Sequence, residues 1–287
     1  MVLHAPAKVN LHLEIRGLLP DGYHEILSVV HSIPLFDSVH VRSLKAQNSL
    51  TVHCDPPLGG KPNIALTAAK AFASRCRVET GIEIRIEKRI PVGAGLGGGS
   101  SDAAAVLSGL NSLFSFPLSE AELHELAAKI GSDVPFFLNG SAALMSGRGE
   151  IIRALRPRAD LFVVLVDPGF PVSTARAYDW WDAETGEERR SVAAGQLQLQ
   201  FEHQPPISWT FFNSFQRAVE RRYPLIGRIR EDLEQAGADL AVMSGSGSSV
   251  VGIYADAETA RAAHRRVRAA HPRAWLLVPL QSVGFTD

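Results

Sequence analysis

Hydrophobic residues occupy every second position near the start of the chain, at Val9, Leu11, Leu13 and Ile15. Polar residues fill the positions between them, at Lys8, Asn10, His12 and Glu14. Successive side chains of a β-strand point to opposite faces, so this alternation predicts a half-buried strand with one polar face. Lys8 and Asn10 would then project side by side from the polar face.

The rest of the first half alternates between extended and helical patterns. Apolar or β-branched runs predict strands at residues 25–31, 38–42, 49–53 and 82–86. Helical spacing predicts helices at residues 63–76, from about 101 to 113, and from 119 onward. Ser100 or Ser101 is expected to cap the second helix, and Ser119 with Glu122 resembles a capping box for the third.

The composition changes near residue 155, where an Arg-rich stretch gives way to an apolar run. We place a domain boundary there, with one domain at 1–154 and a second at 155–287. Strands of the second domain are expected at 161–166, 240–242, 250–254 and 275–280. Helices are expected at 211–235, with a break at Pro224, and at 256–271, whereas 184–200 is polar and indicates a loop-rich stretch. The arginines between 261 and 273 are typical of a solvated helix face.

A glycine-rich segment follows the strand at 82–86 and precedes a helix. It reads Pro91-Val92-Gly93-Ala94-Gly95-Leu96-Gly97-Gly98-Gly99-Ser100-Ser101, with five glycines in seven positions. Without side chains in the way, successive backbone N–H groups and the N-terminus of the next helix can bind an anion, and phosphate is the natural ligand. A plain flexible turn is the alternative, although glycine at this density carries an entropy cost that a turn does not require.

Two other phosphate-binding motifs do not match this segment. Residues 93–98 satisfy G-x-G-x-x-G, but a dinucleotide-binding fold needs a second strand that ends in an acidic residue about 20 residues on. Residues 101–130 instead read as two helices. A Walker loop needs a lysine directly after the glycines, and this segment has none there. The segment therefore indicates a phosphate site of another class.

Composition narrows the possible partners. The chain has 287 residues, of which 46% are hydrophobic, enough for one large core or two ordinary ones. A formal net charge of -1 offers no positive field for nucleic acid or an anionic membrane. No apolar run is long enough to span a bilayer, no signal sequence is evident, and Cys54 and Cys76 lack metal-ligand spacing. We therefore expect a cytoplasmic protein that is a monomer or a weak homodimer.

The glycine-rich segment resembles the nucleotide loop of the kinases grouped as galactokinase, homoserine kinase, mevalonate kinase and phosphomevalonate kinase. Its triple glycine is similar to one branch in particular, the kinases of 4-diphosphocytidyl-2-C-methyl-D-erythritol. Three further motifs resemble that branch, namely Ala5-Pro6-Ala7-Lys8-Val9-Asn10-Leu11, Asp21-Gly22-Tyr23-His24 and Gly131-Ser132-Asp133-Val134-Pro135-Phe136. Weaker likenesses lie at Val172-Ser173-Thr174-Ala175 and Ser244-Gly245-Ser246-Gly247-Ser248.

The resemblance implies an α+β fold of two domains. The N-terminal domain would have a ribosomal-protein-S5-like α/β fold and the C-terminal domain a ferredoxin-like fold, with the active site in the cleft between them. ATP would be the co-substrate, with Mg²⁺, and Asn63 and Lys88 would lie near the adenine. We find no carboxylate pair dedicated to the metal. The implied product is the 2-phospho derivative of the cytidyl substrate, in the non-mevalonate route to isoprenoid precursors.

The resemblance also assigns roles at the site of phosphoryl transfer. Asp133 would take the proton of the acceptor hydroxyl, and Lys8 would hold Asp133 ionised and stabilise phosphate charge. From the residues alone, Asp133 fits a helix N-cap equally well, and Lys8 fits a solvated surface lysine better.

The implied acceptor is a small molecule that carries a cytidine diphosphate group. Tyr23 and Tyr178 would stack on its cytosine, and His24 and Asn10 would form hydrogen bonds to it. Without the resemblance, Tyr23 and His24 are ordinary turn residues and Tyr178 is a core aromatic.

One segment departs from the family pattern. Where the family often has Asn-Asp-Leu-Glu, this chain reads Asn213-Ser214-Phe215-Gln216, so we assign no catalytic role there. Two alternatives stay open. Another kinase of the group, such as homoserine kinase, would not depend on cytosine, and the motif at residues 21–24 argues against it. A binding protein with a degenerate kinase fold would bind ATP without turnover, and the retention of Lys8 and Asp133 argues against that.

Overall fold

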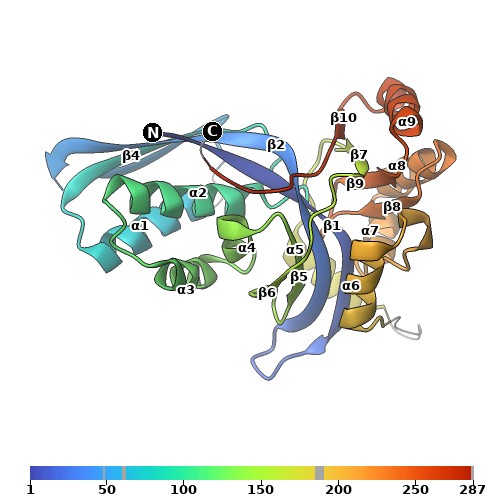
Figure 1. Ribbon diagram of the computed structural model, residues 1–287, viewed down its shortest axis with the longest axis horizontal. Helices are drawn as coiled ribbons and strands as arrows, with labels where there is room; N and C mark the ends of the chain where they lie inside the picture. Colours follow the sequence, from blue (N-terminus) through green and yellow to red (C-terminus); the bar gives the residue numbers. More distant parts are fainter. Residues whose placement is uncertain (48, 60–62, 185–190, 286–287) are drawn as a thin grey trace.

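Two lobes, each built on one β-sheet, lie side by side in the computed structural model (Figure 1). The structure describes residues 1–47, 49–59, 63–184 and 191–285. One lobe holds a six-stranded sheet and the other a four-stranded sheet. The expected two-domain α+β fold is confirmed. The first sheet ends at Ala154 and the second begins at Phe162, while the boundary at 154/155 itself stays a prediction.

The first sheet is mostly antiparallel, as predicted. Its strands run in the order β3–β4–β2–β5–β6, and β1 pairs with β2 off this path. Among the described pairs, β3 and β4 alone are parallel. The strands are β1 (Val2–Leu18), β2 (His24–Gln47), β3 (Leu50–Asp55), β4 (Thr80–Glu87), β5 (Ala142–Ser146) and β6 (Ile151–Ala154).

Helices cover one face of this sheet (Figure 1), namely α1 (Ile64–Cys76), α2 (Gly98–Leu113), α3 (Glu120–Ile130) and α4 (Val134–Asn139). Helix α2 is buried along most of its length, because its alanines let it approach the sheet and the neighbouring helices closely. Its side chains share one hydrophobic core with Phe72, Ile84 and Phe136. This packing holds the start of α2, where the glycine-rich segment ends, in a fixed place.

The helix starts test the predicted caps. Ser119 and Glu122 form the capping box that the sequence predicted for α3. The predicted cap of α2 at Ser100 or Ser101 is wrong, because α2 already begins at Gly98 with Gly97 in the N-cap position. A left-handed backbone at Gly97 allows this earlier start, and both serines lie inside the first turn.

The second sheet has the strand order β10–β7–β9–β8, and every described pair is antiparallel. In chain order the first strand lies between the last and the third, which is the ferredoxin-like arrangement expected. The strands are β7 (Phe162–Val166), β8 (Leu240–Met243), β9 (Val250–Tyr254) and β10 (Ala274–Leu277). The helices are α5 (Thr174–Asp182), α6 (Ala194–His203), the 3-10 turn η1 (Pro206–Ser208), α7 (Gln216–Arg222), α8 (Pro224–Gln235) and α9 (Ala257–Ala270).

Several predicted elements differ from the structure. Residues 25–31 and 38–42 belong to one continuous strand, β2, because its antiparallel pairing with β1 extends over most of both strands. The stretch 184–200 is not all loop: α6 starts at Ala194 and buries Leu197 and Phe201, while residues 185–190 lie outside the described part of the chain. Residues 211–215 are not helical, since Asn213 pairs with Leu13 of β1. The last strand is shorter than predicted and ends at Leu277.

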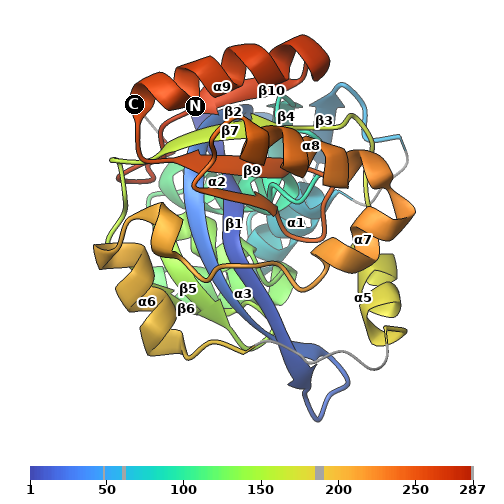
Figure 2. The same cartoon turned by 90° about the vertical axis from the view of Figure 1, so that its right-hand side faces the viewer.

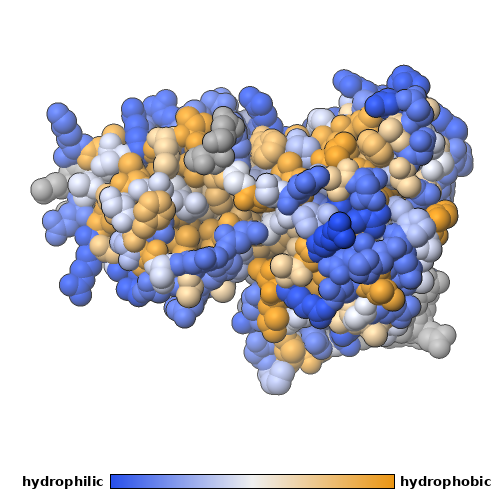
Figure 3. All heavy atoms as spheres, in the orientation of Figure 1, coloured by the Kyte–Doolittle hydropathy of each residue, from blue (hydrophilic) through white to orange (hydrophobic). Residues whose placement is uncertain are grey.

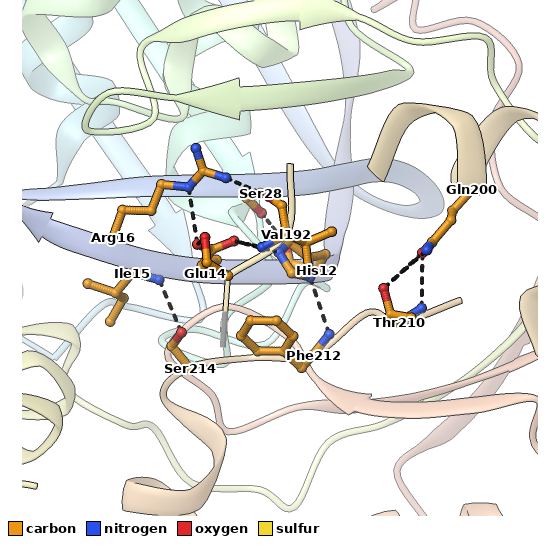
Figure 4. A network of polar contacts seen from close by, with 11 residues as sticks. His12, Glu14, Ile15, Arg16, Ser28, Val192, Gln200, Thr210, Phe212 and Ser214 are labelled. Carbon is orange, nitrogen blue, oxygen red and sulfur yellow. Dashed lines mark hydrogen bonds and ion pairs between the residues drawn. The ribbon is translucent and has the colours of Figure 1, made fainter. Parts of the chain in front are cut away.

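The polar face of β1 is buried, which the half-buried prediction missed. His12 is 0% exposed and Glu14 1% exposed, because segments of the second lobe cover them. The backbone N–H of Phe212 donates to His12 Nδ1 at 3.3 Å, and that of Val192 donates to Glu14 Oε2 at 3.1 Å (Figure 4). In the view of Figure 2, β1 runs between α5 and α6. Strand β1 therefore belongs to the first sheet and also packs against the second lobe.

The C-terminal segment, up to Phe285, returns to the first lobe and contacts the N-terminal strand. The backbone N–H of His4 donates to the carbonyl oxygen of Phe285 at 2.8 Å, and the Phe285 ring joins the first core. On the face drawn in Figure 3, hydrophilic and hydrophobic residues are interspersed over both lobes. Within the described ranges, no helix has the length and apolar character needed to cross a membrane.

Candidate active site

The glycine-rich segment, residues 91–101, connects β4 to α2 near the polar face of β1. Gly93, Gly95 and Gly97 have φ angles of 74°, 78° and 70°, which only glycine adopts without strain. No side chain caps α2. The N–H groups of its first turn lack partners within the helix, as at any helix start, and together with the helix dipole they form an anion site. The geometry therefore supports a phosphate site at the start of α2.

Packing gives a second reason for these glycines. A Cβ on Gly95 would lie 2.0 Å from the carbonyl oxygen of Ser244, in the second glycine-serine segment. Ser244 Oγ donates to the Gly95 carbonyl at 2.9 Å, and the Ser249 N–H donates to the Ala94 carbonyl at 3.1 Å. The two glycine-containing segments, far apart in the chain, thus pack as one unit across the lobes.

Lys8 and Asp133 meet beside this segment. Lys8 Nζ lies 3.4 Å from Asp133 Oδ2, and their side chains are 6% and 34% exposed. The backbone N–H of Lys8 donates to the Leu96 carbonyl at 3.0 Å, so β1 is attached to the glycine-rich segment at this residue. Lys8 is not a solvated surface lysine. Asp133 does occupy the N-cap position of α4, but its side chain forms no capping hydrogen bond and is available to a ligand.

Asn10 lies beside Lys8 on the same face of β1. Its Oδ1 accepts a hydrogen bond from Lys8 Nζ, and its Nδ2 donates to Ser28 Oγ at 2.8 Å. Its backbone N–H donates to Ser244 Oγ at 3.0 Å. Asn10 is 4% exposed. The structure therefore groups Asn10 with the Lys8–Asp133 pair through direct hydrogen bonds.

Two of the predicted acceptor residues, His24 and Tyr178, form a cluster of rings. The His24 ring stacks on Tyr178 with centroids 4.5 Å apart, and His24 Nε2 lies 2.9 Å from Asp182 Oδ1. Tyr23 is 59% exposed, and the Arg148 guanidinium lies 4.8 Å from its ring centroid. The resemblance implied that Tyr23 and Tyr178 would stack on the cytosine, which stays a prediction, and nothing in the sequence indicated that His24 would lie on Tyr178.

Tyr178 connects this cluster to the Lys8–Asp133 pair. Burial, followed by the negative charges of Asp133 and Asp182, raises the pKa of Tyr178 to about 12. The hydroxyl therefore stays protonated and can donate a hydrogen bond at any physiological pH. An acceptor molecule that touches Tyr178 would also lie within reach of the field of Asp133.

The family models and relatives agree with this geometry. The model described as GHMP kinases N terminal domain matches residues 63–141, and GHMP kinases C terminal matches residues 195–273. The 4-diphosphocytidyl-2-C-methyl-D-erythritol kinase of Treponema pallidum subsp. pallidum is 42% identical over 272 residues, which cover 92% of this chain and 93% of that protein. The chain belongs to this kinase family. As a member, it is an ATP-dependent phosphotransferase.

Two solved kinase structures share this fold but differ in their sequence identity to the chain. A crystal structure of a 4-(cytidine 5'-diphospho)-2C-methyl-D-erythritol kinase superposes with a TM-score of 0.80 at 32% identity, covering 99% of this chain and 100% of the other. A homoserine kinase from Cytophaga hutchinsonii superposes with a TM-score of 0.70 at 19% identity, covering 99% and 95%. The second likeness shows the shared fold alone.

Lys88 lies beneath the glycine-rich segment of this family member. Its ammonium forms ion pairs with Asp37 and, at 2.6 Å, with Asp102 Oδ2. Burial, together with the charge of Asp37 and against that of Lys88, raises the pKa of Asp102 to about 7. The sequence prediction placed Lys88 near the adenine, and that placement stays a prediction. It missed both carboxylates, since nothing in the local pattern marks Asp37 as a partner of Lys88.

Asn63, the other residue predicted near the adenine, is the N-cap of α1. Its Oδ1 accepts from the Ala65 N–H at 3.0 Å, and its Nδ2 donates to Cys54 Sγ at 3.3 Å. Cys54 also lines a cavity of about 520 Å³ together with His53 and Asp55. A cavity of this size is in the range of ligand pockets. Asn63 does not line this cavity, and its role near the adenine stays a prediction.

The segment that departs from the family pattern connects the lobes. Asn213 Nδ2 donates to the carbonyls of Met243 and Gly245, at 2.6 and 2.7 Å. Ser214 Oγ accepts from the Ile15 N–H at 3.0 Å, and Gln216 Oε1 accepts from the Met243 N–H at 3.0 Å. All of these contacts are made by neutral groups. A negative charge in this segment is not needed to hold β1 against the second lobe.

Proposed function

We propose that the protein transfers the γ-phosphoryl group of ATP to the 2-hydroxyl of 4-diphosphocytidyl-2-C-methyl-D-erythritol, a step of the non-mevalonate route to isoprenoid precursors, in the cytoplasm. The observation that carries this proposal is the meeting of Lys8 with the partly exposed carboxylate of Asp133, 3.4 Å apart, beside the start of α2. The choice of substrate rests on relatives named 4-diphosphocytidyl-2-C-methyl-D-erythritol kinase, which match nearly the whole chain.

The transfer follows from the positions of these groups. The phosphates of ATP would lie on the N–H groups of residues 93–101 and at the N-terminus of α2. The acceptor oxygen attacks the γ-phosphorus, its proton passes to Asp133, and the bond between that phosphorus and the β–γ bridging oxygen breaks to release ADP. Lys8, 3.4 Å from Asp133 Oδ2, would face the negative charge on the transferring group.

Mg²⁺ is part of the proposal. Within the described residues, no group of three or more His, Cys, Asp or Glu side chains is placed to hold a metal ion. We propose that the cation arrives bound to ATP, because Mg²⁺ needs only one or two protein carboxylates when phosphate oxygens and water are its other ligands. Asp133 is the partly exposed carboxylate of the site, and Mg²⁺ would supply charge neutralisation there.

The cytosine would bind at the cluster of His24 and Tyr178, with the exposed ring of Tyr23 as a further stacking surface. Aromatic rings give a base a stacking surface, and hydrogen bonds along its edge would distinguish cytosine from uracil. His24 is the polar ring of the cluster and is the group we assign to that edge. The resemblance also assigned Asn10 to the cytosine, but Asn10 binds Lys8. We therefore assign Asn10 to the end of the acceptor where the phosphoryl group is transferred.

A coupled ADP-release assay tests the proposal. With ATP and Mg²⁺, the cytidyl substrate should support turnover, whereas homoserine, mevalonate and the uridyl analogue of the substrate should not. Turnover with homoserine instead would identify a different kinase of the group. ATP binding without ADP release on any acceptor would indicate a binding protein, and equal rates with the uridyl analogue would contradict the role of His24.

A further inference from the structure

The direction of the Lys8 ammonium depends on Asn10. An ammonium group has three N–H donors and needs acceptors around it when it is buried. Two acceptors contact Lys8: the Oδ1 of Asn10 and the Oδ2 of Asp133. A side-chain amide can be turned so that its oxygen and nitrogen exchange places. Whether Asn10 accepts from Lys8 or opposes it therefore depends on what holds the other end of the amide.

Ser28 of β2 holds that other end, and its single proton decides the arrangement. The Ser28 hydroxyl donates to the carbonyl oxygen of His12 at 2.6 Å. A hydroxyl has one proton, so the oxygen of Ser28 can only accept from Asn10, at 2.8 Å. Ser28 is 0% exposed, so bulk water does not compete for these bonds.

A β-bulge makes the His12 carbonyl available to Ser28. Strands β1 and β2 pair in regular register from Ala7 to Asn10, which lies opposite Val30. His12 then lies opposite Val29, so β1 has one extra residue at Leu11. A bulge disrupts the ladder hydrogen bonds locally and re-aims side chains, and bulges are frequent beside active sites. Here the carbonyl of His12, next to the bulge, accepts the hydrogen bond from the Ser28 hydroxyl.

We infer that Ser28 is a positioning residue for phosphoryl transfer. With Ser28 as acceptor, the amide nitrogen of Asn10 must face Ser28 and the amide oxygen must face Lys8. The reversed amide would set its NH₂ group against the ammonium and its oxygen against the lone pairs of Ser28, leaving buried donors and acceptors unpaired. Ser28 thus holds the ammonium toward Asp133 without touching either substrate. This inference rests on the proposed function of Lys8 and Asp133.

Ser28→Ala tests the inference in the full-length protein. Losing a buried hydrogen bond of this kind should lower kcat about tenfold, while KM for ATP changes less than about twofold. Ser28→Thr, which keeps the hydroxyl, should recover most of kcat. The matched control is Ser32→Ala. Ser32 is also 0% exposed and lies directly opposite Lys8 in the β1–β2 pairing, but its hydroxyl donates to the Gly140 carbonyl at 3.2 Å. Ser32→Ala should leave kcat within about twofold of wild type.

A double-mutant cycle separates positioning from a general loss of stability. If Ser28 acts through Asn10, adding Ser28→Ala to Asn10→Ala should lower kcat no further. Two independent losses that multiply would overturn the inference, as would normal kcat in Ser28→Ala.

One readout does not need turnover and keeps the two proposals apart. In wild type the side-chain amide protons of Asn10, followed by NMR, should exchange slowly with solvent. They should exchange faster in Ser28→Ala and stay slow in Ser32→Ala. Unchanged exchange in Ser28→Ala contradicts the positioning role. No ADP release by wild type with the cytidyl substrate contradicts the proposed function, whatever the exchange shows.

Discussion

Two buried lysines lie under neighbouring glycines of the same segment, yet their surroundings differ. The side chains of Lys8 and Lys88 are 6% and 5% exposed. A Cβ on Gly97 would lie 3.0 Å from Lys8 Cγ, and a Cβ on Gly98 would lie 3.3 Å from Lys88 Nζ. The glycine-rich segment therefore rests on both lysines, and burial alone does not distinguish them.

Their partners do. Lys88 pairs with two carboxylates, Asp37 and Asp102, whose side chains are 0% and 5% exposed. Lys8 pairs with a neutral amide and with Asp133, which is 34% exposed. The Lys88 cluster is closed to solvent, and its ion pairs hold the strand, the glycine-rich segment and α2 together. The Lys8 pair is open on one side, so a substrate can reach its carboxylate. The solvent exposure of the paired carboxylate, rather than the burial of the lysine, is what distinguishes the candidate reaction site.

The largest expected effect follows from removing one charge from each cluster. Asp133→Asn should lower kcat by about 10² to 10⁴-fold, because it removes the proton acceptor, with ATP binding and thermal stability largely kept. Asp102→Asn, the same change in the closed cluster, should leave kcat within about tenfold of wild type. Steady-state kinetics with the cytidyl substrate measures both. Near-normal turnover in Asp133→Asn would mean that the open carboxylate is not the base.

Removing each lysine should reverse the contrast when stability is measured. Lys88→Met leaves two buried carboxylates facing each other without a counter-charge, so the free energy of unfolding should fall by about 3–5 kcal/mol. Lys8→Met leaves Asp133, which contacts water, and the buried amide oxygen of Asn10 without their partner, and should cost about 1–2 kcal/mol. Urea unfolding of the two variants measures this difference. Equal losses would show that the Lys8 pair is also structural.

The smallest expected effect is a change in pH dependence. The pKa of Asp102 is raised from 3.8 to about 7 in the folded protein, chiefly by burial. Between these values the folded state holds a proton that the unfolded state releases, so this group makes stability fall as pH rises from about 4 to 7. Above pH 7 both states are ionised and the effect is complete.

Asp102→Asn isolates that contribution. His12 and His31, whose pKa values burial lowers from 6.5 to about 4, act in the opposite direction and make stability rise with pH over nearly the same window. The wild-type curve is therefore a sum. The difference between wild type and Asp102→Asn should change between pH 4 and 7 and be flat above. A difference that is constant across pH would mean that Asp102 is ionised throughout.

Sequence reasoning did well where a residue type has a local cause. The capping box of Ser119 and Glu122 depends only on residues three apart, and it is present as predicted. The helix break at Pro224 is likewise present, with α8 beginning at that residue. It did less well where long-range pairing decides. Strand β2 runs through a stretch that the local pattern divides in two, because β1 pairs along it.

The candidate site shows the same division. The motifs around Lys8, Asp133 and the glycines can be read from the chain, and relatives matched over nearly its whole length establish family membership. The buried carboxylate pair around Lys88, the stacking of His24 on Tyr178 and the role of Ser28 cannot be read in this way. Each arises where strands or helices distant in sequence come together, and no local pattern encodes such a contact.

The residue pattern by itself determined most of the element order and a glycine-rich segment able to bind phosphate, because propensity and backbone freedom are local properties. The fold class and the candidate pair Lys8 and Asp133 came from the resemblance of whole motifs to a kinase family. Only the tertiary structure decided the surroundings of each polar residue. It buries the polar face of β1 against the second lobe, aims Lys8 at an open carboxylate, and closes Lys88 between two buried ones. A charge in a folded protein acts according to its neighbours and its access to water, and both are set by packing between distant segments.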